Sequence, residues 1–593
     1  MHLKNIGVEN FRVFGEKTEF SFRPITVLTG KNSSGKSSLN KLLLLLKQNY
    51  GVYKDLNSLK LGDELSNLHS SEKIKSWGIE ADRVTIEFDF PLNHFEGNST
   101  LHLSYNFKKK QSLNLSLIEI RNEGKMLIKY HHMYDAENGE EFSLCSCELN
   151  HKLILDTFNR LVEEEKRSAE KRKSDRDRAV KDYKKQIKEG GYWFLSHPQE
   201  EEPSEEFVNF GYLSLENVFG SGYSGLNIAS FLEEELLFSC DHEGKPVDLS
   251  DFSELFSLGE EMFTPKTFNC IDWDSSDSYS EDCLGDLFKQ LKLPLHWFYI
   301  QDKVEHATGL TGVTINPSER NKKIVKELIA DNIKYSFDAL KEVFRGLEYI
   351  SPHRGNQNRV LSSSSNRTDI EAIVNEFGLK IHLDNSNNKV IIEFIEDSLS
   401  LFGLKAKIDI KRIEDVASVL YLIIDKRRVL LSDIGYGYAQ LIPILLKIGL
   451  IASDSMQGLD WESRALREGI SYGSSLLILE EPEANLHPDF QSKLADVIVS
   501  AGKKFNIQFI VETHSEYFIR KLQYLTAKKD ILPEHTVIYY FYNPTDIPKG
   551  ESQVNEINIT PNGGLTDSFG TGFFDEATNI KMELLRINQI QKN

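Results

Sequence analysis

The chain has 593 residues, of which 40% are hydrophobic and 27% are charged, and its formal net charge is −20. This length exceeds what one compact core supports and predicts two or three structural units. The excess of acidic residues disfavours a general affinity for nucleic acid, whose phosphates would be repelled, and leaves only a local basic groove open.

The sequence shows neither a secretory signal nor a membrane span. No apolar run reaches the roughly 18 residues that a membrane helix needs, and the N-terminal stretch MHLKNIGVENF lacks the apolar centre of a signal peptide. The five cysteines are odd in number and sparse, which fits structural thiols in a reducing compartment rather than a disulfide framework. We therefore expect a cytoplasmic protein that does not contact the membrane.

Residues 1–150 predict an N-terminal lobe. LKNIGVENF and FSFRPITVLTG have the composition of strands, and the second run ends at Gly30. The following run, SSLNKLLLLLKQ, consists of good helix formers. From about residue 82 to residue 150, apolar and polar residues alternate with a period of two between turn-forming segments, which predicts an antiparallel meander.

Residues 151–345 predict an insertion domain that is helical with acidic loops. A helical pattern with a dense charge run covers residues 152–189. Residues 195–290 are acidic and irregular, and they predict loops around short helices. Residues 318–346 have a strongly amphipathic pattern, which predicts one helix or a pair of helices.

Residues 346–593 predict a second lobe with α/β character. LSSSSNRTD, at 361–369, is a flexible loop by composition. VLYLIIDKRRVLLSD predicts strands and YAQLIPILLKIGLIA a buried helix, while SLLILEEP and FNIQFIVETHS predict apolar strands that each precede a helix. This alternation predicts a parallel sheet covered on both faces. The predicted fold class is α/β, with a mostly parallel core sheet, an antiparallel β-subdomain and a helical insertion.

The strongest motif is GKNSSGKS at residues 30–37, between a predicted strand and a predicted helix. It satisfies G-x-x-x-x-G-K-[ST], in which backbone N–H groups and the helix N-terminus face phosphates. We expect Lys36 to reach the β- and γ-phosphates of ATP and the Ser37 hydroxyl to bind Mg²⁺. The predicted nucleotide-binding residues of this segment are Gly30, Asn32, Ser33, Ser34, Gly35, Lys36, Ser37 and Ser38.

Two acids end the apolar strand LLILEEP, much further along the chain. Carboxylates at the C-terminal end of a buried strand suit a metal–phosphate site at the rim of a sheet. We predict that Glu480 belongs to the Mg²⁺ shell, through a water, and that Glu481 is the base that polarises the attacking water. FIVETHS delivers His514 to the same edge, where it would donate to the γ-phosphate. An isolated histidine after a strand is usually a structural hydrogen-bonder, but the order of the motifs favours the catalytic interpretation.

This order of motifs, with SDIGYGYAQLIPIL before LLILEEPEANLHP and FIVETHSEYFIRKL, resembles ABC-type ATPases of the SMC/RecF/OLD group. The resemblance covers residues 1–60 and 345–593 well and the middle poorly. It implies a homodimer, or a higher homo-oligomer, in which two chains sandwich two ATP molecules. The signature segment would contact the ATP of the opposite protomer, although it departs from the L-S-G-G-Q form. Its predicted nucleotide-binding residues are Ser432, Gly435, Gly437 and Gln440.

Three further segments carry the same resemblance. Asn485–His487 match the D-loop at the dimer seam, and Tyr349–Arg354 resembles a Y-x-x-P-x-R segment of OLD-like ATPases, which implies that Arg354 approaches the nucleotide. Thr566–Glu576 resembles the C-terminal extension of a bacterial subgroup often encoded in defence loci. By resemblance, the protein is the ATPase of an anti-phage system of the Septu or retron-associated type, and its partner is a separate nuclease or other effector.

Other functions stay open on the sequence. Too few residues follow His514 to hold the Toprim nuclease domain that OLD nucleases append, so nuclease activity would belong to another chain. Lys166–Lys188 holds eleven Lys or Arg against four acids, and is either a solvated helix face or a contact for DNA or a partner protein. The same ATPase would also serve as a RecF-like DNA-repair ATPase, or as a nucleotide-gated scaffold with little turnover.

Overall fold

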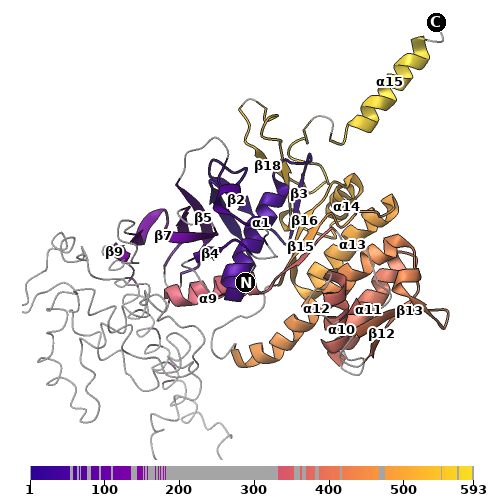
Figure 1. Cartoon of the computed structure of the whole chain (residues 1–593), viewed down its shortest axis with the longest axis horizontal. Coiled ribbons are helices and arrows are strands. Elements are labelled where there is room, and N and C mark those ends of the chain that lie inside the picture. The colour runs from indigo at the N-terminus through magenta and orange to yellow at the C-terminus, as the bar shows by residue number, and fades with distance from the viewer. Residues whose placement is uncertain are drawn as a thin grey trace, which may run out of the picture. The chain divides into compact units, whose positions relative to one another are not determined.

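Figure 1 shows the computed structural model of the chain. It describes residues 2–53, 58–62, 66, 68–76, 82–92, 95–107, 111–134, 143–150, 153, 157, 160, 167, 171, 174, 178, 181, 332–352, 361–362, 369–380, 386–413, 417–465, 475–548, 550–570 and 573–590. Two compact units divide the chain. The first comprises residues 1–90, 100–117 and 335–593, and the second comprises residues 91–99 and 118–334.

A six-stranded sheet forms the centre of the first unit. Its strands are, in spatial order, β10 (Leu347–Ile350), β15 (Ser475–Glu480), β16 (Ile507–Glu512), β3 (Ile25–Gly30), β17 (Thr536–Phe541) and β18 (Val554–Asn558). The first five run parallel, and β18 pairs antiparallel with β17. Every residue of β3, β16 and β17 is buried, as expected of strands covered on both faces. The predicted α/β class with a mostly parallel core sheet is confirmed.

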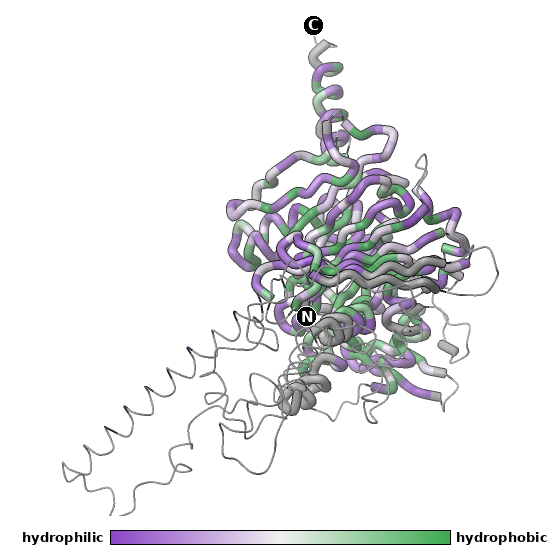
Figure 2. The backbone as a smooth tube through the Cα atoms, turned by 90° about the vertical axis from the view of Figure 1, so that its left-hand side faces the viewer, coloured by the Kyte–Doolittle hydropathy of each residue, from purple (hydrophilic) through white to green (hydrophobic). Residues whose placement is uncertain are grey.

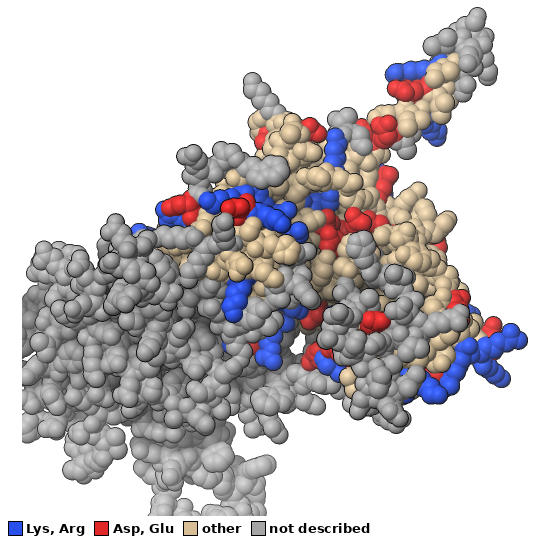
Figure 3. Space-filling model, in the orientation of Figure 1, with Lys and Arg blue, Asp and Glu red and all other residues tan. Residues whose placement is uncertain are grey.

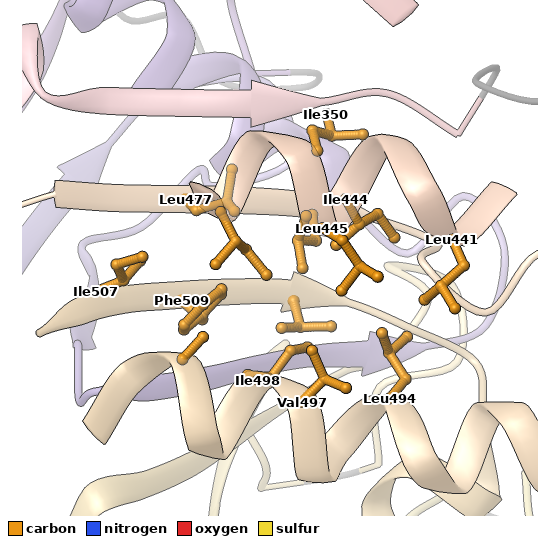
Figure 4. Close-up of a cluster of buried hydrophobic side chains, with 14 of the residues drawn as sticks. Ile350, Leu441, Ile444, Leu445, Leu477, Leu494, Val497, Ile498, Ile507 and Phe509 are labelled. Carbon is orange, nitrogen blue, oxygen red and sulfur yellow. The ribbon is translucent and has the colours of Figure 1, made fainter. Parts of the chain in front are cut away.

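Helices pack against this sheet through one large apolar core. They include α12 (Tyr436–Ala465), α13 (Pro488–Phe505) and α14 (Glu516–Ala527). Helix α1 (Lys36–Leu46), which a π-helical segment (Lys47–Tyr53) continues, contacts β3 and buries a separate run of leucines. In Figure 4, side chains of α12 and α13 converge with those of the strands: Leu441, Ile444, Leu445, Leu494, Val497, Ile498, Leu477 and Phe509. Figure 2 shows the same pattern as hydrophobic stretches along the inner strands and helices.

Although the sequence holds no uninterrupted apolar run of that length, the stretch Tyr436–Asp454 of α12 has the length and mean hydropathy of a membrane-spanning helix, and 78% of it is buried inside the protein. It is the segment in which the sequence predicts a buried helix. Among the described residues no other helix meets that length and hydropathy. Burial against α10, α11 and α13 accounts for the apolar composition of this stretch.

The N-terminal strands form an antiparallel sheet, as the period-two pattern predicts. In the first unit its order is β2, β1, β5, β6, β7, with β4 on β7. The bounds are β1 (Asn5–Glu9), β2 (Thr18–Ser21), β4 (Ser58–Lys60), β5 (Arg83–Asp89), β6 (Ser99–Asn106) and β7 (Ser112–Asn122). In the second unit, β8 (Lys125–Tyr134) and β9 (Ser143–Leu149) pair antiparallel.

A third sheet corrects one expectation. The run VLYLIIDKRRVLLSD does not add to the parallel sheet, because Asp425 and Lys426 both have positive φ and turn the chain into a hairpin. Its strands are β11 (Leu361–Ser362), β12 (Lys407–Ile413), β13 (Ala417–Ile424) and β14 (Arg427–Leu430), all antiparallel. Helices α10 (Asp369–Lys380) and α11 (Ser386–Leu401) each contact both this sheet and α12.

Other predictions fall partly or wholly outside the described residues. Of the predicted helix at 318–346, the structure describes α9 (Asn332–Arg345). Of the predicted loop at 361–369, it describes β11 and the first residue of α10. The eight positions described between 153 and 181 are helical, while the acidic segment 195–290 and Arg354 lie outside. The chain ends with α15 (Glu576–Ile590), and short 3₁₀ turns occur at Ser71–Lys73, Leu431–Asp433 and Pro533–His535.

Candidate active site

The loop between β3 and α1 is built around two glycines with positive φ. Gly30 has φ of 143°, and a Cβ there would lie 2.4 Å from the carbonyl oxygen of Phe541 on β17. Gly35 has φ of 110°, and its Cβ would lie 2.4 Å from Val13 Cγ2. Because Gly35 caps α1 without a side chain, the first N–H groups of the helix face a potential anion rather than a capping group.

Lys36 is the cation of this loop. It is 4% exposed, and its Nζ donates to the carbonyl oxygens of Gly30 at 3.0 Å and Lys31 at 2.9 Å. Burial lowers the pKa of Lys36, and four nearby carboxylates oppose that effect: Glu512, Glu481, Glu480 and Glu483. The lysine is thus held at the turn of the loop and faces the acids of the neighbouring strands.

The other predicted residues of the loop line it on both sides. Asn32 and Ser33 are exposed, and Ser33 has φ of 63°. Ser34 is buried, and its carbonyl oxygen accepts from Gln553 Nε2 at 3.0 Å. Ser38 is also buried, and its Oγ accepts from Arg12 Nε at 3.1 Å.

Three acids meet at the ends of β15 and β16. The two strands are parallel with Glu480 and Glu512 in register, which places the two carboxylates side by side at one edge of the sheet. The Tyr349 hydroxyl donates to Glu480 Oε2. Glu481 follows with φ of 43°, and its N–H donates to the carbonyl oxygen of Glu512 at 2.8 Å.

Glu512 makes the direct contact with α1, the helix that follows the phosphate-binding loop. Its Oε1 accepts from Ser37 Oγ at 3.1 Å and its Oε2 accepts from Asn40 Nδ2 at 2.6 Å. Burial and the neighbouring Glu480 raise the pKa of Glu512 to about 7, against the opposing influence of Lys36. Ser37, which the sequence predicts to share a metal shell with Glu480, therefore has Glu512 as its described carboxylate partner.

His514 lies beyond the end of β16. Its backbone N–H donates to Glu483 Oε1 at 2.7 Å. The backbone N–H of the preceding Thr513 donates to Leu28 O at 2.9 Å, and the Thr513 carbonyl oxygen accepts from Thr29 Oγ1 at 2.7 Å. Burial lowers the pKa of His514, Lys36 lowers it further, and Glu481 opposes both. The neutral imidazole is therefore favoured at this position.

The predicted signature segment lies at the start of α12. Gly435 is exposed, Ser432 and Gly437 are partly exposed, and Gln440 is buried. A Cβ at Gly437 would lie 3.7 Å from Leu486 Cδ2, so the segment adjoins the predicted D-loop. In that D-loop, Asn485 is exposed with φ of 61°, and the His487 side chain caps α13 by accepting from Asp489 N at 3.3 Å.

Four residues of the site were not singled out in the sequence: Glu512, Asn40, Glu483 and Arg12. Glu512 directly precedes Thr513 and His514, and Glu483 belongs to the EEPE turn, so both lie inside motifs that the sequence does show. Asn40 lies one helical turn after Ser37, where it shares a helix face with that residue. Arg12 has no such local signal, because only the fold brings it to Ser38.

A protein-family model described as an AAA ATPase domain matches residues 1–519. The chain belongs to the AAA ATPase domain family. The predicted ATPase class is thereby confirmed, and a nucleotide is the ligand that this family implies. A second model, described as a protein of unknown function (DUF3696), matches residues 531–584. None of the curated proteins matches the chain.

Similar solved structures are heads of SMC proteins. The SMC head domain from Thermotoga maritima is 12% identical with a TM-score of 0.32, over 94% of this chain and 100% of that one. The Smc head bound to the C-winged helix domain of ScpA is 10% identical with a TM-score of 0.32, over 94% and 98%. An Smc head with an extended coiled coil, bound to the C-terminal domain of ScpA, from Pyrococcus furiosus, is 12% identical with a TM-score of 0.31, over 98% and 99%.

The donor set at this edge fits Mg²⁺. The cation prefers oxygen ligands, and the Ser37 hydroxyl and the Glu512 and Glu480 carboxylates supply them beside the phosphate-binding loop. In addition, Asn40 Oδ1 is buried and has no hydrogen-bond partner among the described residues, which leaves an acceptor for a metal-bound water. ATP and Mg²⁺ are therefore compatible with the residues present.

Proposed function

We propose that the protein binds and hydrolyses ATP and converts its nucleotide state into a change of conformation, as an ABC-type ATPase of the SMC/RecF/OLD-like group. The observation that carries this proposal is geometric: Ser37, beside Lys36 in the phosphate-binding loop, donates to Glu512 at the end of β16, and Glu480 on β15 lies in register with Glu512. These residues come from segments far apart in the sequence, and a purely structural role would not require one cation and several acids at the rim of a phosphate-binding loop.

In this proposal each residue has a separate task. Lys36 neutralises the phosphate oxygens, and the loop N–H groups orient them. Glu481 accepts the proton of the attacking water, and its left-handed backbone turns the residue out of the line of β15. His514, whose lowered pKa favours the neutral imidazole, donates to the γ-phosphate. When bound, Mg²⁺ would supply charge neutralisation to the β- and γ-phosphates, with Ser37 and nearby carboxylates as its protein ligands.

The proposal further includes an ATP sandwich of two chains. Its support is the exposure of Gly435 and Asn485 and the proximity of Gly437 to Leu486, which put the signature and the D-loop on one accessible stretch of the first unit. Ser432, Gly435, Gly437 and Gln440 would then contact the nucleotide of the partner chain. Nucleotide turnover would separate the chains and so act as a switch.

Phosphate release under saturating ATP and Mg²⁺ tests the enzymatic part. The wild type should turn over ATP, and Glu481→Gln should retain nucleotide while losing turnover. Sedimentation with ATP tests the sandwich, because Glu481→Gln should accumulate as a dimer and Lys36→Ala should stay monomeric under the same conditions. A wild type without turnover, together with a Glu481→Gln variant that never dimerises, would contradict the proposal.

We place this switch in the cytoplasm as the ATPase of an anti-phage system that controls a separate nuclease or other effector. The support is the resemblance of Thr566–Glu576 to the tail of defence-associated ATPases. Phage plating on cells that carry the gene with its neighbours tests it: protection should be lost with Lys36→Ala. Equal plating with and without the intact locus would refute the defence role and leave the ATPase role intact.

A second candidate, a DNA-dependent ATPase of the RecF kind, has one structural observation in its favour. The third sheet carries a row of exposed cations, visible at the lower right of Figure 3. They are Lys405, Lys407, Lys411, Arg412, Lys426, Arg427 and Arg428. The Arg428 guanidinium also lies over the Tyr421 ring, 5.8 Å from its centroid. Such a face suits phosphates, but lysines on an edge strand also simply discourage aggregation.

Measuring ATP turnover with and without duplex DNA distinguishes a DNA-dependent ATPase from the effector-controlling ATPase proposed above. If DNA is the trigger, turnover should rise with DNA at low salt, and Lys407→Glu/Lys411→Glu should abolish the rise. Lys389→Glu, at a side chain 75% exposed on α11, is the matched control and should keep it. Turnover that DNA leaves unchanged at low salt would remove this candidate.

A further inference from the structure

We propose that Glu512, rather than Glu480, is the acid that holds the Ser37 hydroxyl in the magnesium shell, and that Glu480 acts with Tyr349 as a positioning pair. This inference rests on the proposed ATP-hydrolysing function and specifies the metal site within it. It assigns the metal-site acid to the strand that carries His514, instead of the strand that carries the catalytic base.

The contacts of Glu512 are the first reason. The side chain is 3% exposed, and each carboxylate oxygen has a separate partner on α1: Ser37 Oγ at 3.1 Å and Asn40 Nδ2 at 2.6 Å. Because Ser37 and Asn40 are three residues apart on one helix, they present neighbouring groups to a single carboxylate. The helix that begins at the phosphate-binding loop therefore holds this acid at the hydroxyl that P-loop enzymes use for Mg²⁺.

The order of the strands is the second reason. β16 is the direct neighbour of β3, whereas β15 lies one strand further away. Since adjacent strands are about 4.8 Å apart, the backbone of Glu480 lies roughly that much further from β3 than the backbone of Glu512. The Glu480 carboxylate accepts the hydroxyl hydrogen of Tyr349, which belongs to β10 on the far side of β15. Glu480 thus has a hydrogen-bond partner on the strand that lies away from β3.

The local charge is the third reason. Glu480 and Glu512 lie in register at the ends of neighbouring strands, Glu481 follows directly and donates its backbone N–H to Glu512 O, and Lys36 is the cation of the adjoining loop. One ammonium group does not balance this set, so a divalent cation with oxygen ligands would be favoured there. The buried Asn40 Oδ1, which has no partner among the described residues, adds an acceptor for a water of that cation on the same amide that holds Glu512.

The test measures how far Mg²⁺ strengthens nucleotide binding. A fluorescent, slowly hydrolysed ATP analogue is titrated with excess Mg²⁺ and with EDTA, for the wild type, Glu512→Gln and Glu480→Gln. Glu512→Gln should keep its affinity in EDTA within about threefold, while its enhancement by Mg²⁺ should fall roughly 10- to 100-fold, the usual cost of a disturbed metal site. Ser37→Ala should fall equally, and Glu480→Gln should keep the enhancement.

Mn²⁺ provides a second readout that does not depend on the fluorophore. Electron paramagnetic resonance of Mn²⁺ with ATP should show weaker metal binding for Glu512→Gln and unchanged metal binding for Tyr349→Phe. Affinity retained in EDTA shows that a variant is folded. If Glu512→Gln fails this check, Glu512→Asp, which keeps the charge but withdraws the carboxylate from Ser37, takes its place with the same expected loss.

The possible failures are distinguishable. A wild type that binds no nucleotide contradicts the proposed function itself. A wild type with Mg²⁺-enhanced binding, combined with a Glu512→Gln variant that keeps the enhancement, overturns only this inference. The inference also falls if Glu480→Gln loses as much enhancement as Glu512→Gln, because the metal would then depend on Glu480 as well.

Discussion

Glu348 of β10 offers a quantitative test of how the first unit is held together. Its Oε1 lies 3.1 Å from Lys47 Nζ, just after α1, and its Oε2 lies 2.6 Å from Lys447 Nζ on α12. The two lysine side chains are only 15% and 12% exposed. One carboxylate of β10, at the edge of the core sheet, therefore binds both the segment that continues α1 and the long buried helix α12.

The energy of this contact follows from the two distances. At an effective dielectric constant of about 20, the attractions amount to about 5 and about 6 kcal/mol. Desolvation of three charges offsets much of this, and removing one partner of a buried pair typically costs about 3 to 5 kcal/mol. Because Glu348 is itself 31% exposed, we expect Glu348→Gln to lower the free energy of unfolding by about 3 kcal/mol, at the low end of that range.

The pH dependence has a defined sign. Burial raises the pKa of Glu348, but Lys447 and Lys47 outweigh it and bring the pKa below its usual 4.5. A carboxylate with a depressed pKa contributes its full stabilisation above the usual value and loses it as the pH falls through the lowered value. The difference between the wild type and Glu348→Gln should therefore be constant from neutral pH down to the usual pKa, and it should shrink in more acidic solution.

Hydrogen exchange resolved by peptide is the appropriate assay, since a chain of several units does not unfold in one step. Protection of β10 and α12 should fall in Glu348→Gln at neutral pH. Glu342→Gln is the control, because its partner Arg345 is 71% exposed and such surface pairs contribute little. Protection of both variants equal to the wild type at neutral pH would refute the reasoning, as would a loss that persists unchanged in acid.

Three further predictions concern the site and the tail. Gly30→Ala should abolish nucleotide binding and lower Tm, because its Cβ would lie 2.4 Å from Phe541 O; equilibrium binding checks this, and wild-type affinity would contradict it. Glu481→Gln should reduce ATP turnover at least roughly 100-fold with little change in nucleotide affinity, and turnover within a few-fold of the wild type would exclude it as the base. Phe573→Ala should lower the free energy of unfolding by about 2 kcal/mol, because this partly buried ring packs on Tyr540, Phe569 and Phe574. Limited proteolysis of the segment after β18 should become faster in this variant, and an unchanged cleavage rate would argue against that packing.

The parts of the fold that local patterns determine were predictable. The strand–loop–helix around Lys36 and the apolar strands β15 and β16 each follow from a continuous run of residues, and the antiparallel meander follows from strict alternation. The hairpin β13–β14 was misplaced because its apolar residues look like a buried parallel strand. Only its two-residue turn distinguishes the arrangements, and Asp-Lys is not a typical hairpin turn sequence.

The contacts that define the site were less accessible. The hydrogen bond of Ser37 with Glu512 joins residues 475 positions apart, and its existence depends on the register of β16 against β3. The sequence places Glu480, Glu481 and His514 at strand ends, but it does not say which acid faces α1. Likewise, β17 has clear strand composition, while its place beside β3 depends on pairing that no local pattern encodes.

The position of β3 also governs when the protein can fold. This strand ends at Gly30, yet its two neighbours, β16 and β17, begin at Ile507 and Thr536, more than 470 residues later. During translation both edges of β3 remain unpaired until β16 and β17 have left the ribosome, and unpaired apolar strands are prone to aggregate. Biosynthesis should therefore depend on chaperones that shield the nascent N-terminal segment, and premature termination before β17 should yield insoluble protein rather than a partly active fragment.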